Sequence, residues 1–288
     1  MTRVAAIVPS LHGTHLEPLL AALRSQTRPP DDIIVIRGVS PNGRARNAGV
    51  TQTDAEWLLF IDDDAIPGHV DLIERLLATA QRPNVVAVGS ARLLPPDAPP
   101  FQRHVADQVA RIVHPVVGTD TITNPDPPHF YCDITTTCLL MHRTYFDQIG
   151  GFDESLIRGV DTEFLVRLRR ISTSDSPANI VQSGDTWVYH PAPSTLSGLW
   201  RKHVQYGIGH AQEVVRDPTR ARGGNWFATP IHAAVWLLWR TLIVPIHCIL
   251  PYSFADPRWR LRWAPLKALS SYASALGYIY GWYRYART

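Results

Sequence analysis

The sequence predicts an α/β protein in which helices flank a mixed sheet, with a helical extension at the C-terminal end. Three observations predict this class. Apolar runs rich in β-branched residues alternate with segments of helical periodicity, an order typical of strands wound with helices. Three consecutive aspartates follow one apolar run, where ligands bind in such sheets. From Trp226 onward the composition becomes basic and aromatic. We therefore expect one domain over 1–215 and an extension over 216–288.

The expected elements follow from the period of the apolar residues. Leu16, Leu19, Leu20 and Leu23 share one helical face. These leucines predict a helix at 16–26. Further helices are expected at 44–51, 69–81, 101–117, 143–149, 159–171 and 194–215. The expected strands, short apolar runs, lie at 3–9, 32–37, 57–61, 84–93, 135–141 and 179–189. Pro-Asn-Gly at 41–43 predicts a turn, and 118–128 predicts a polar loop.

The aspartate triplet Asp62-Asp63-Asp64 directly follows the apolar run at 57–61. Adjacent carboxylates repel one another unless water or a cation neutralises them. Mg²⁺ is often held by one or two carboxylates together with the phosphates of a substrate. The triplet therefore indicates a metal–diphosphate site, and the alternative is an ordinary solvated turn.

Composition restricts the setting of the protein. The three cysteines, Cys132, Cys138 and Cys248, are odd in number and lack zinc-type spacing, which favours reduced thiols in a cytoplasmic setting. The apolar stretch at 4–8 is too short for a signal peptide. We expect no nucleic-acid partner.

Several motifs occur in a characteristic order over roughly the first 215 residues. They are Ile7-Val8-Pro9, the helix at 19–26, Gly43-Arg44-Ala45-Arg46-Asn47-Ala48-Gly49, the triplet with its preceding strand, Gly150-Gly151-Phe152-Asp153-Glu154, the segment 159–168, Tyr189-His190-Pro191, and 200–210 with Tyr206-Gly207. Taken together, they resemble the family 2 glycosyltransferases, which have the GT-A fold. This resemblance implies transfer of a sugar from a nucleotide donor with inversion at the anomeric carbon.

The resemblance assigns roles around the triplet. It implies that Asp62 contacts the donor ribose and that Asp64 binds Mg²⁺ or Mn²⁺. Asp63 belongs to the same donor site, but its side chain is expected to point elsewhere. His190 is expected to ligate the metal or donate a hydrogen bond to the diphosphate. The alternative is a half-buried histidine whose hydrogen bonds are all made within the protein. A bound metal would stabilise negative charge on the departing nucleotide.

Other donor-side residues come from the first strand and from the turn before the triplet. Pro9, Arg44 and Asn47 are assigned to donor binding. Arg44, Arg46 and Asn47 could instead brace the turn, an interpretation that suits Asn47 better than Arg44. Basic residues after the last strand could contact the diphosphate or form a solvated face: Arg201, Lys202 and His203.

Asp161 resembles the general base of the family. A position near a helix N-terminus would keep its carboxylate ionised and ready to accept a proton from the acceptor hydroxyl. The alternative is an ordinary helix cap. Asp153 and Glu154 are expected to fix the preceding loop, and Glu163 is a weaker candidate for the base.

Two departures from the family pattern matter. An acidic pair that usually recognises the base is replaced by Arg37-Gly38-Val39-Ser40. The family favours a UDP-sugar. Arginine, however, cannot accept a hydrogen bond from the N–H of uracil, so the sequence does not assign the nucleobase of the donor. An acidic residue before Asp161 is replaced by Val160. This change affects acceptor binding rather than the expected role of Asp161 as the general base.

The extension carries seven basic residues and one acidic residue from Trp226 onward, a charge of +6 within a chain of +3. Its apolar segment 228–250 contains Arg240 and Pro245, which disfavour a membrane span. On a helical wheel a polar–aromatic stripe faces an apolar side. The stripe is His232, Trp236, Arg240, Ile243 and His247, and the opposite side is Ala234, Leu238, Leu242 and Ile249.

A second aromatic segment covers 258–287. Such helices suit the interface of an anionic membrane. The alternative is that both segments pack on the enzyme or on a second copy of the chain, so a homo-oligomer stays open.

The sequence thus predicts a metal-dependent hexosyltransferase on the cytoplasmic side of the cell membrane, peripheral or shallowly inserted. Its expected partners are a nucleotide-sugar donor, a glycan or polyprenyl-linked acceptor, and an anionic membrane surface. The alternatives are a non-catalytic relative that binds a nucleotide or a partner, and a nucleotidyltransferase on a similar fold.

Overall fold

The structure is a computed structural model that describes residues 2–13, 16–109, 112–122, 134–173, 177–218, 229–249 and 265–287. The chain divides into two compact units. The first contains Met1–Pro95, His114–Ser155 and Val160–His190, and the second contains Pro96–Val113, Leu156–Gly159 and Pro191–Thr288. The domain boundary expected at residue 215 stays a prediction.

The first unit is built on one mixed sheet with the order β2-β1-β3-β7-β5-β8-β4, to which β6 adds by pairing with β8. Strands β1, β2 and β3 run parallel, as do β5 and β8. Strand β7 is antiparallel to both β3 and β5, between which it lies. The strands are β1 (Val4–Ser10), β2 (Asp32–Arg37), β3 (Trp57–Ile61), β4 (Ile66–Pro67), β5 (Val85–Leu93), β6 (Thr121–Ile122), β7 (Cys138–His142) and β8 (Asn179–Tyr189).

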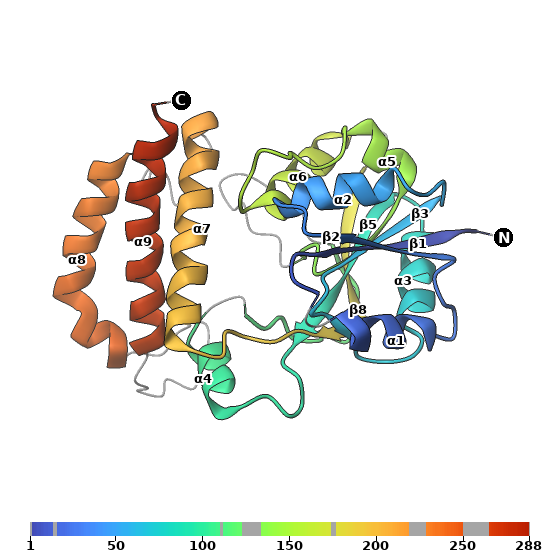
Figure 1. The fold of residues 1–288 in the computed structure, drawn as a ribbon, viewed down its shortest axis with the longest axis horizontal. Coiled ribbons are helices and arrows are strands. Elements are labelled where there is room, and N and C mark those ends of the chain that lie inside the picture. Colours follow the sequence, from blue (N-terminus) through green and yellow to red (C-terminus); the bar gives the residue numbers. More distant parts are fainter. Residues whose placement is uncertain are drawn as a thin grey trace. The chain divides into compact units, whose positions relative to one another are not determined.

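Helices cover both faces of this sheet, because the central strands are apolar on both sides. Figure 1 shows α1 and α3 on one face and α2, α5 and α6 on the other. Alternate residues of β1 divide between the faces: Val8 joins the core of α1 and α3, whereas Ile7 packs against Gly49 of α2. These helices are α1 (Leu16–Arg24), α2 (Asn42–Val50), α3 (Leu72–Ala80), α5 (Arg143–Gln148) and α6 (Val160–Arg170).

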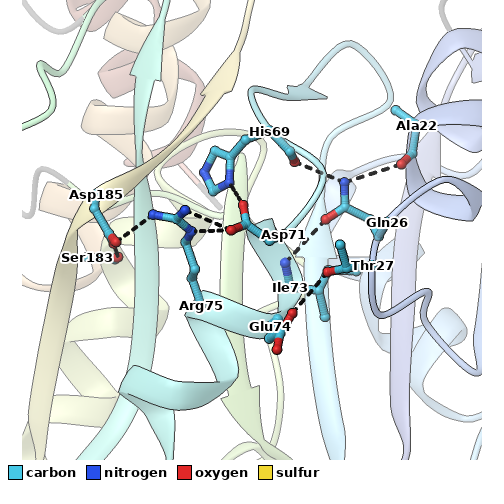
Figure 2. Close-up of polar contacts among 10 residues, drawn as sticks. All are labelled: Ala22, Gln26, Thr27, His69, Asp71, Ile73, Glu74, Arg75, Ser183 and Asp185. Carbon is cyan, nitrogen blue, oxygen red and sulfur yellow. Dashed lines mark hydrogen bonds and ion pairs between the residues drawn. The ribbon is translucent and has the colours of Figure 1, made fainter.

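A polar network fixes the chain between the aspartate triplet and α3 (Figure 2). Asp71 contacts His69 Nδ1 and accepts a hydrogen bond of 2.8 Å from Arg75 Nε, while Arg75 Nη1 reaches Asp185 at 2.8 Å. Gln26 Nε2 donates to the His69 carbonyl at 3.1 Å. The hydrogen bond from Arg75, followed by that from His69, lowers the pKa of Asp71 to about 2. These contacts anchor the far end of the loop that begins at the triplet.

The second unit contains helices only, within the part of the chain that is described. They are α4 (Pro100–Gln108), α7 (Leu196–Arg216), α8 (Pro230–Ile249) and α9 (Pro265–Tyr285). Helix α9 packs between α7 and α8 (Figure 1). No described helix is both long enough and apolar enough to cross a membrane.

The fold class is confirmed, while several element ends differ from the prediction. The helix expected at 101–117 ends at Gln108, since Val109 is extended and His114 pairs with Arg92 as a β-bridge. The turn expected at 41–43 contributes the first residues of α2, because Pro41 takes the extended N-cap conformation. The strand expected at 135–141 begins only at Cys138.

Candidate functional site

Two strand ends bring together three side chains that could hold a metal ion. Asp62 and Asp64 follow β3, and His190 follows β8. Backbone hydrogen bonds hold both ends: Asp62 N–H donates to the Thr137 carbonyl at 3.2 Å, and His190 N–H donates to the Leu93 carbonyl at 2.8 Å. One ligand atom from each of the three side chains lies within 4.8 Å of the others. The structure therefore places His190 with the two aspartates expected to contact the donor and the metal.

The chemistry of this cluster fits a divalent cation. Carboxylate oxygen is the ligand that Mg²⁺ and Mn²⁺ prefer, and imidazole nitrogen is accepted by first-row transition metals. His190 Nε2 lies 3.3 Å from Asp64 Oδ1, close enough for both atoms to coordinate one cation. The side chains of Asp62, Asp64 and His190 are 23%, 30% and 15% exposed. Because all three are partly exposed, a substrate oxygen could complete the coordination sphere.

Asp63 points away from this cluster toward the first strand. Its Oδ2 accepts a hydrogen bond of 2.6 Å from Ser10 Oγ, and Ser10 Oγ accepts one of 3.1 Å from Gly13 N–H. Pro9, the preceding residue, is buried in β1 and lies in register with Ile36. Asp63 thus ties the loop after β1 to the end of β3, an arrangement that supports the donor side indirectly.

Helix α2 connects the triplet to the block before Asp161. Arg46 Nη2 donates to Asp62 Oδ1 at 2.7 Å, and its guanidinium lies 5.5 Å from the centroid of the Phe152 ring. A Cβ at Gly43 would lie 3.1 Å from Val160 Cγ1. Glycine therefore lets the start of α2 approach the start of α6 without displacing its neighbours.

Asn47 holds the same block through its amide group. Its Oδ1 accepts from Phe152 N–H at 2.9 Å, and its Nδ2 donates to the Phe152 carbonyl at 2.9 Å and to Glu154 Oε1 at 3.0 Å. Arg44 is 65% exposed and lies 4.0 Å from Glu154. Asn47 therefore braces the turn in this structure, whereas Arg44 is accessible to a donor.

Asp161 is the second residue of α6, which follows Gly159 with its φ of +76°. Its Oδ1 accepts a hydrogen bond of 3.1 Å from Thr162 N–H, a contact within the first turn. Glu163 is held differently: it forms a bidentate ion pair with Arg167, at 2.5 and 2.8 Å. Arg167 also donates to the carbonyl oxygen of Gly151 at 2.7 Å. Glu163 is thus committed to bracing the loop, which leaves Asp161 better suited to take a proton.

Four phenylalanines lie beneath the site and join its two halves. The Phe60 and Phe152 rings meet edge to face at 5.0 Å, and the Phe152 and Phe164 rings stack at 4.1 Å. Phe146 packs against Phe60 at 5.6 Å. Phe60 precedes Asp62 by two positions in β3, and Phe164 follows Asp161 by three in α6. The relative positions of the two halves therefore depend on one aromatic core.

Arg201 and His203 lie on α7, in the second unit. Arg201 is exposed, and His203 Nδ1 lies 3.2 Å from Ser274 Oγ of α9. Burial, aided by the charge of Lys202, lowers the pKa of His203 to about 4. His203 is therefore neutral near pH 7 and adds no positive charge for a diphosphate. The diphosphate contact expected of these two residues stays a prediction.

Sequence reasoning left Arg46 uncommitted and did not consider Arg92. Arg46 is the buried arginine of its turn, at 3% exposure, and its position three residues after Gly43 on the inner face of α2 is the signal that could have identified it. Arg92 Nη1 donates to Thr135 Oγ1 at 3.2 Å and to Thr137 Oγ1 at 3.5 Å. Arg92 thereby supports the Thr137 segment, whose carbonyl receives the Asp62 N–H.

Replacing Arg46 by methionine is expected to lower the free energy of unfolding by about 1–3 kcal/mol, because Asp62 loses a charged hydrogen-bond partner that lies in the protein interior. Urea denaturation measures the change. Arg44→Met is the matched control, since this side chain lies two residues away on the same helix but is exposed. Its cost is expected to stay within about 0.5 kcal/mol. Equal losses in both variants would contradict the structural role of Arg46.

Comparisons with known proteins agree with this architecture. Residues 25–150 match the model of the family described as Glycosyl transferase family 2. The O-antigen biosynthesis protein RfbC of Myxococcus xanthus is 26% identical over 186 residues. That alignment covers 58% of this chain, which spans only 14% of the length of this curated relative.

Solved structures resemble the chain over nearly its whole length. The mannosyltransferase PcManGT from Pyrobaculum calidifontis, in complex with GDP-Man and Mn²⁺, is 14% identical with a TM-score of 0.57. The alignment covers 96% of this chain and 87% of that one. S. aureus TarS 1–349, in complex with UDP-GlcNAc, is 12% identical with a TM-score of 0.49, over 99% and 92% of the two chains.

The sheet order, the flanking helices and the acidic cluster after β3 are those of the GT-A fold. Residues 25–150 of the chain thus resemble glycosyl transferase family 2.

Proposed function

We propose that the protein transfers one sugar from a nucleotide-diphosphate sugar to a hydroxyl of a lipid-linked or cell-surface glycan precursor, with inversion and with a divalent metal. The observation that carries the proposal is the convergence of Asp62, Asp64 and His190 within 4.8 Å at two strand ends. The presence of GDP-Man and Mn²⁺ in the mannosyltransferase of the same fold motivates the donor and the metal. The O-antigen relative motivates a cell-surface acceptor.

The residues of the chain divide the chemistry between them. Asp62, Asp64 and His190 would hold Mn²⁺ or Mg²⁺, which when bound stabilises negative charge on the diphosphate. Asp161 takes the proton of the acceptor hydroxyl. The oxygen of that hydroxyl forms a bond to the anomeric carbon as the bond from that carbon to the diphosphate oxygen breaks. Attack from the face opposite the leaving group inverts the configuration. Arg46 keeps Asp62 in place, and the Asn47 clamp keeps the loop before α6 in place.

The nucleobase of the donor is not assigned, because Arg37 lies exposed at the end of β2, where the family pattern has an acidic residue. Arg37 can donate hydrogen bonds but cannot accept them. A guanidinium there favours a base that presents acceptor atoms. The nucleotide is therefore best assigned by a screen of nucleoside diphosphates rather than by the family pattern.

A thermal-shift screen of nucleoside diphosphates with and without Mn²⁺ tests the proposal. At about 100 times the Kd, the preferred nucleotide is expected to raise the Tm by about 5 °C or more with Mn²⁺. EDTA is expected to abolish most of this shift, because the diphosphate then lacks its metal bridge. Asp64→Asn should behave as the wild type does in EDTA.

The matched control is Asp54→Asn, because Asp54 is an aspartate whose side chain is 82% exposed, outside the cluster. This variant should keep the full metal-dependent shift. The main alternative is a non-catalytic relative that binds a nucleotide, and the replacement at Arg37 favours it. A shift that is equal with and without metal, together with no release of nucleotide from any sugar donor, would support that alternative and overturn the proposal.

A further inference from the structure

In the second unit, the backbones of α7 and α9 touch through glycines. A Cβ on Gly207 would lie 2.0 Å from the Ser274 carbonyl oxygen, and one on Gly277 would lie 2.1 Å from the Val204 carbonyl oxygen. At Gly281 the nearest atom, Ile208 Cα, would be 2.8 Å away. The buried residues of α9 are mostly small: Ala268, Ser270, Ala273, Ala275, Gly277, Tyr278 and Gly281. Close packing through small residues is the usual way in which helices associate inside membranes.

Large apolar side chains of the same unit lie on the outside. They form a stripe on α8, made of Ile231, Val235, Leu238, Trp239 and Leu242, with exposures of 73%, 53%, 69%, 57% and 76%. The five positions fall within an arc of about 100° on a helix. On α9, Leu276, Tyr280 and Tyr283 are also 46% to 59% exposed. A soluble helical bundle places its large apolar side chains inside, so the exposed stripe departs from that arrangement.

The stripe lies on the side of α8 that the sequence wheel marks as apolar. Leu238 and Leu242, which belong to the apolar side of the wheel, are exposed. Trp236, which was expected in the polar–aromatic stripe, is partly buried. His232 of that polar–aromatic stripe is exposed. The side chains of Arg240, Ile243, His247 and Ile249 lie outside the described residues. Helix α8 therefore turns its apolar side outward.

The charge of these helices indicates what covers the stripe. Neither α8 nor α9 contains aspartate or glutamate, and their basic residues are Arg240, Lys267 and Arg284. Arg284 and Arg287, at the end of the chain, are exposed. A second copy of the chain would add helices of the same positive charge, whereas an anionic lipid surface would neutralise that charge.

We propose that the α8 stripe docks on an anionic membrane surface, with α8 lying in the plane of the interface. Since no described helix can cross a membrane, the stripe would enter only to the boundary between headgroups and acyl chains, about 5–10 Å deep. The proposal identifies the contact surface of the protein and is independent of the reaction chemistry, because lipid binding requires neither donor nor metal.

Sedimentation of the chain of 288 residues with vesicles tests the proposal. The wild type is expected to bind vesicles of phosphatidylcholine with phosphatidylglycerol at least tenfold better than vesicles of phosphatidylcholine alone. The double variant Leu238→Ala/Leu242→Ala is expected to lose at least tenfold in vesicle affinity, because two leucine side chains no longer enter the lipid. The double variant Arg284→Gln/Arg287→Gln is expected to bind anionic vesicles with an affinity that is lower by about fivefold for each charge removed.

Leu11→Ala/Val70→Ala is the matched control, since both side chains are exposed apolar residues of the first unit, at 51% and 57%. It should bind vesicles as the wild type does. Melting temperatures check that each variant is folded. Failure of the wild type to bind anionic vesicles would overturn the proposal. So would a wild-type dimer that Leu238→Ala/Leu242→Ala converts to a monomer, because the stripe would then be an interface between copies.

Discussion

Replacing Asp161 by asparagine is expected to slow sugar transfer by about 10²–10⁴-fold, the usual contribution of a general base. The amide has the shape of the carboxylate and can still accept the Thr162 N–H through its oxygen, so α6 should keep its first turn. It cannot take the proton of the acceptor hydroxyl. Nucleotide release from the donor chosen by the thermal-shift screen, with a membrane extract as the source of acceptor, measures the rate. The metal-dependent thermal shift should be unchanged.

Glu163→Gln is the matched control for this prediction, because the residue is a carboxylate on the same turn of α6. Its ion pair with Arg167 predicts a loss of stability rather than of turnover. Glu163→Gln is therefore expected to lower the free energy of unfolding by about 1–3 kcal/mol while transfer continues at near the wild-type rate. If Glu163→Gln stopped transfer and Asp161→Asn did not, the base would be Glu163.

Replacing Phe164 by alanine is expected to lower the free energy of unfolding by about 3–5 kcal/mol, the usual cost of removing a buried phenylalanine. The side chain is fully buried and packs on Phe60, Phe146 and Phe152. The resulting cavity lies between β3, which leads to Asp62, and α6, which carries Asp161. Denaturation in urea measures the loss.

A double-mutant cycle with Phe152→Ala shows how much of this cost belongs to the aromatic pair. The rings stack at 4.1 Å, and such pairs contribute about 0.5–1.5 kcal/mol beyond their buried area. Tyr283→Ala is the control, since its ring is 52% exposed and its loss should cost about 0.5 kcal/mol or less. Additive losses at Phe152 and Phe164 would contradict the view that this core joins the two halves of the site.

Local pattern predicted the parts of the fold that depend on neighbouring residues. The apolar run at 57–61 and the triplet after it predicted the third strand and its acidic end, because an uninterrupted apolar run and a group of charges are visible in a short window. His190 was predicted to lie at a strand end, where the structure has it. The family resemblance is confirmed, and with it the GT-A fold.

The remaining features depend on contacts between distant residues. The insertion of β7 between β3 and β5 is not visible in its apolar sequence, since direction in a sheet is set by connections. The Arg46–Asp62 ion pair requires α2 to lie over the end of β3, so the position of Arg46 after Gly43 could mark the residue but not its partner. Asp63 was expected to point away from Asp62 and Asp64, as it does, but its hydrogen bond to the distant Ser10 could not be predicted.

The place of β8 in the sheet has a consequence for how the protein is made. Strand β8 is the parallel partner of β5, and His190 follows it. A nascent chain that has left the ribosome only as far as β7 already contains both aspartates but lacks the imidazole and the strand that holds it. The proposed metal site would therefore be completed only after most of the first unit has emerged. Metal affinity in a series of C-terminal truncations would accordingly report when this sheet is finished.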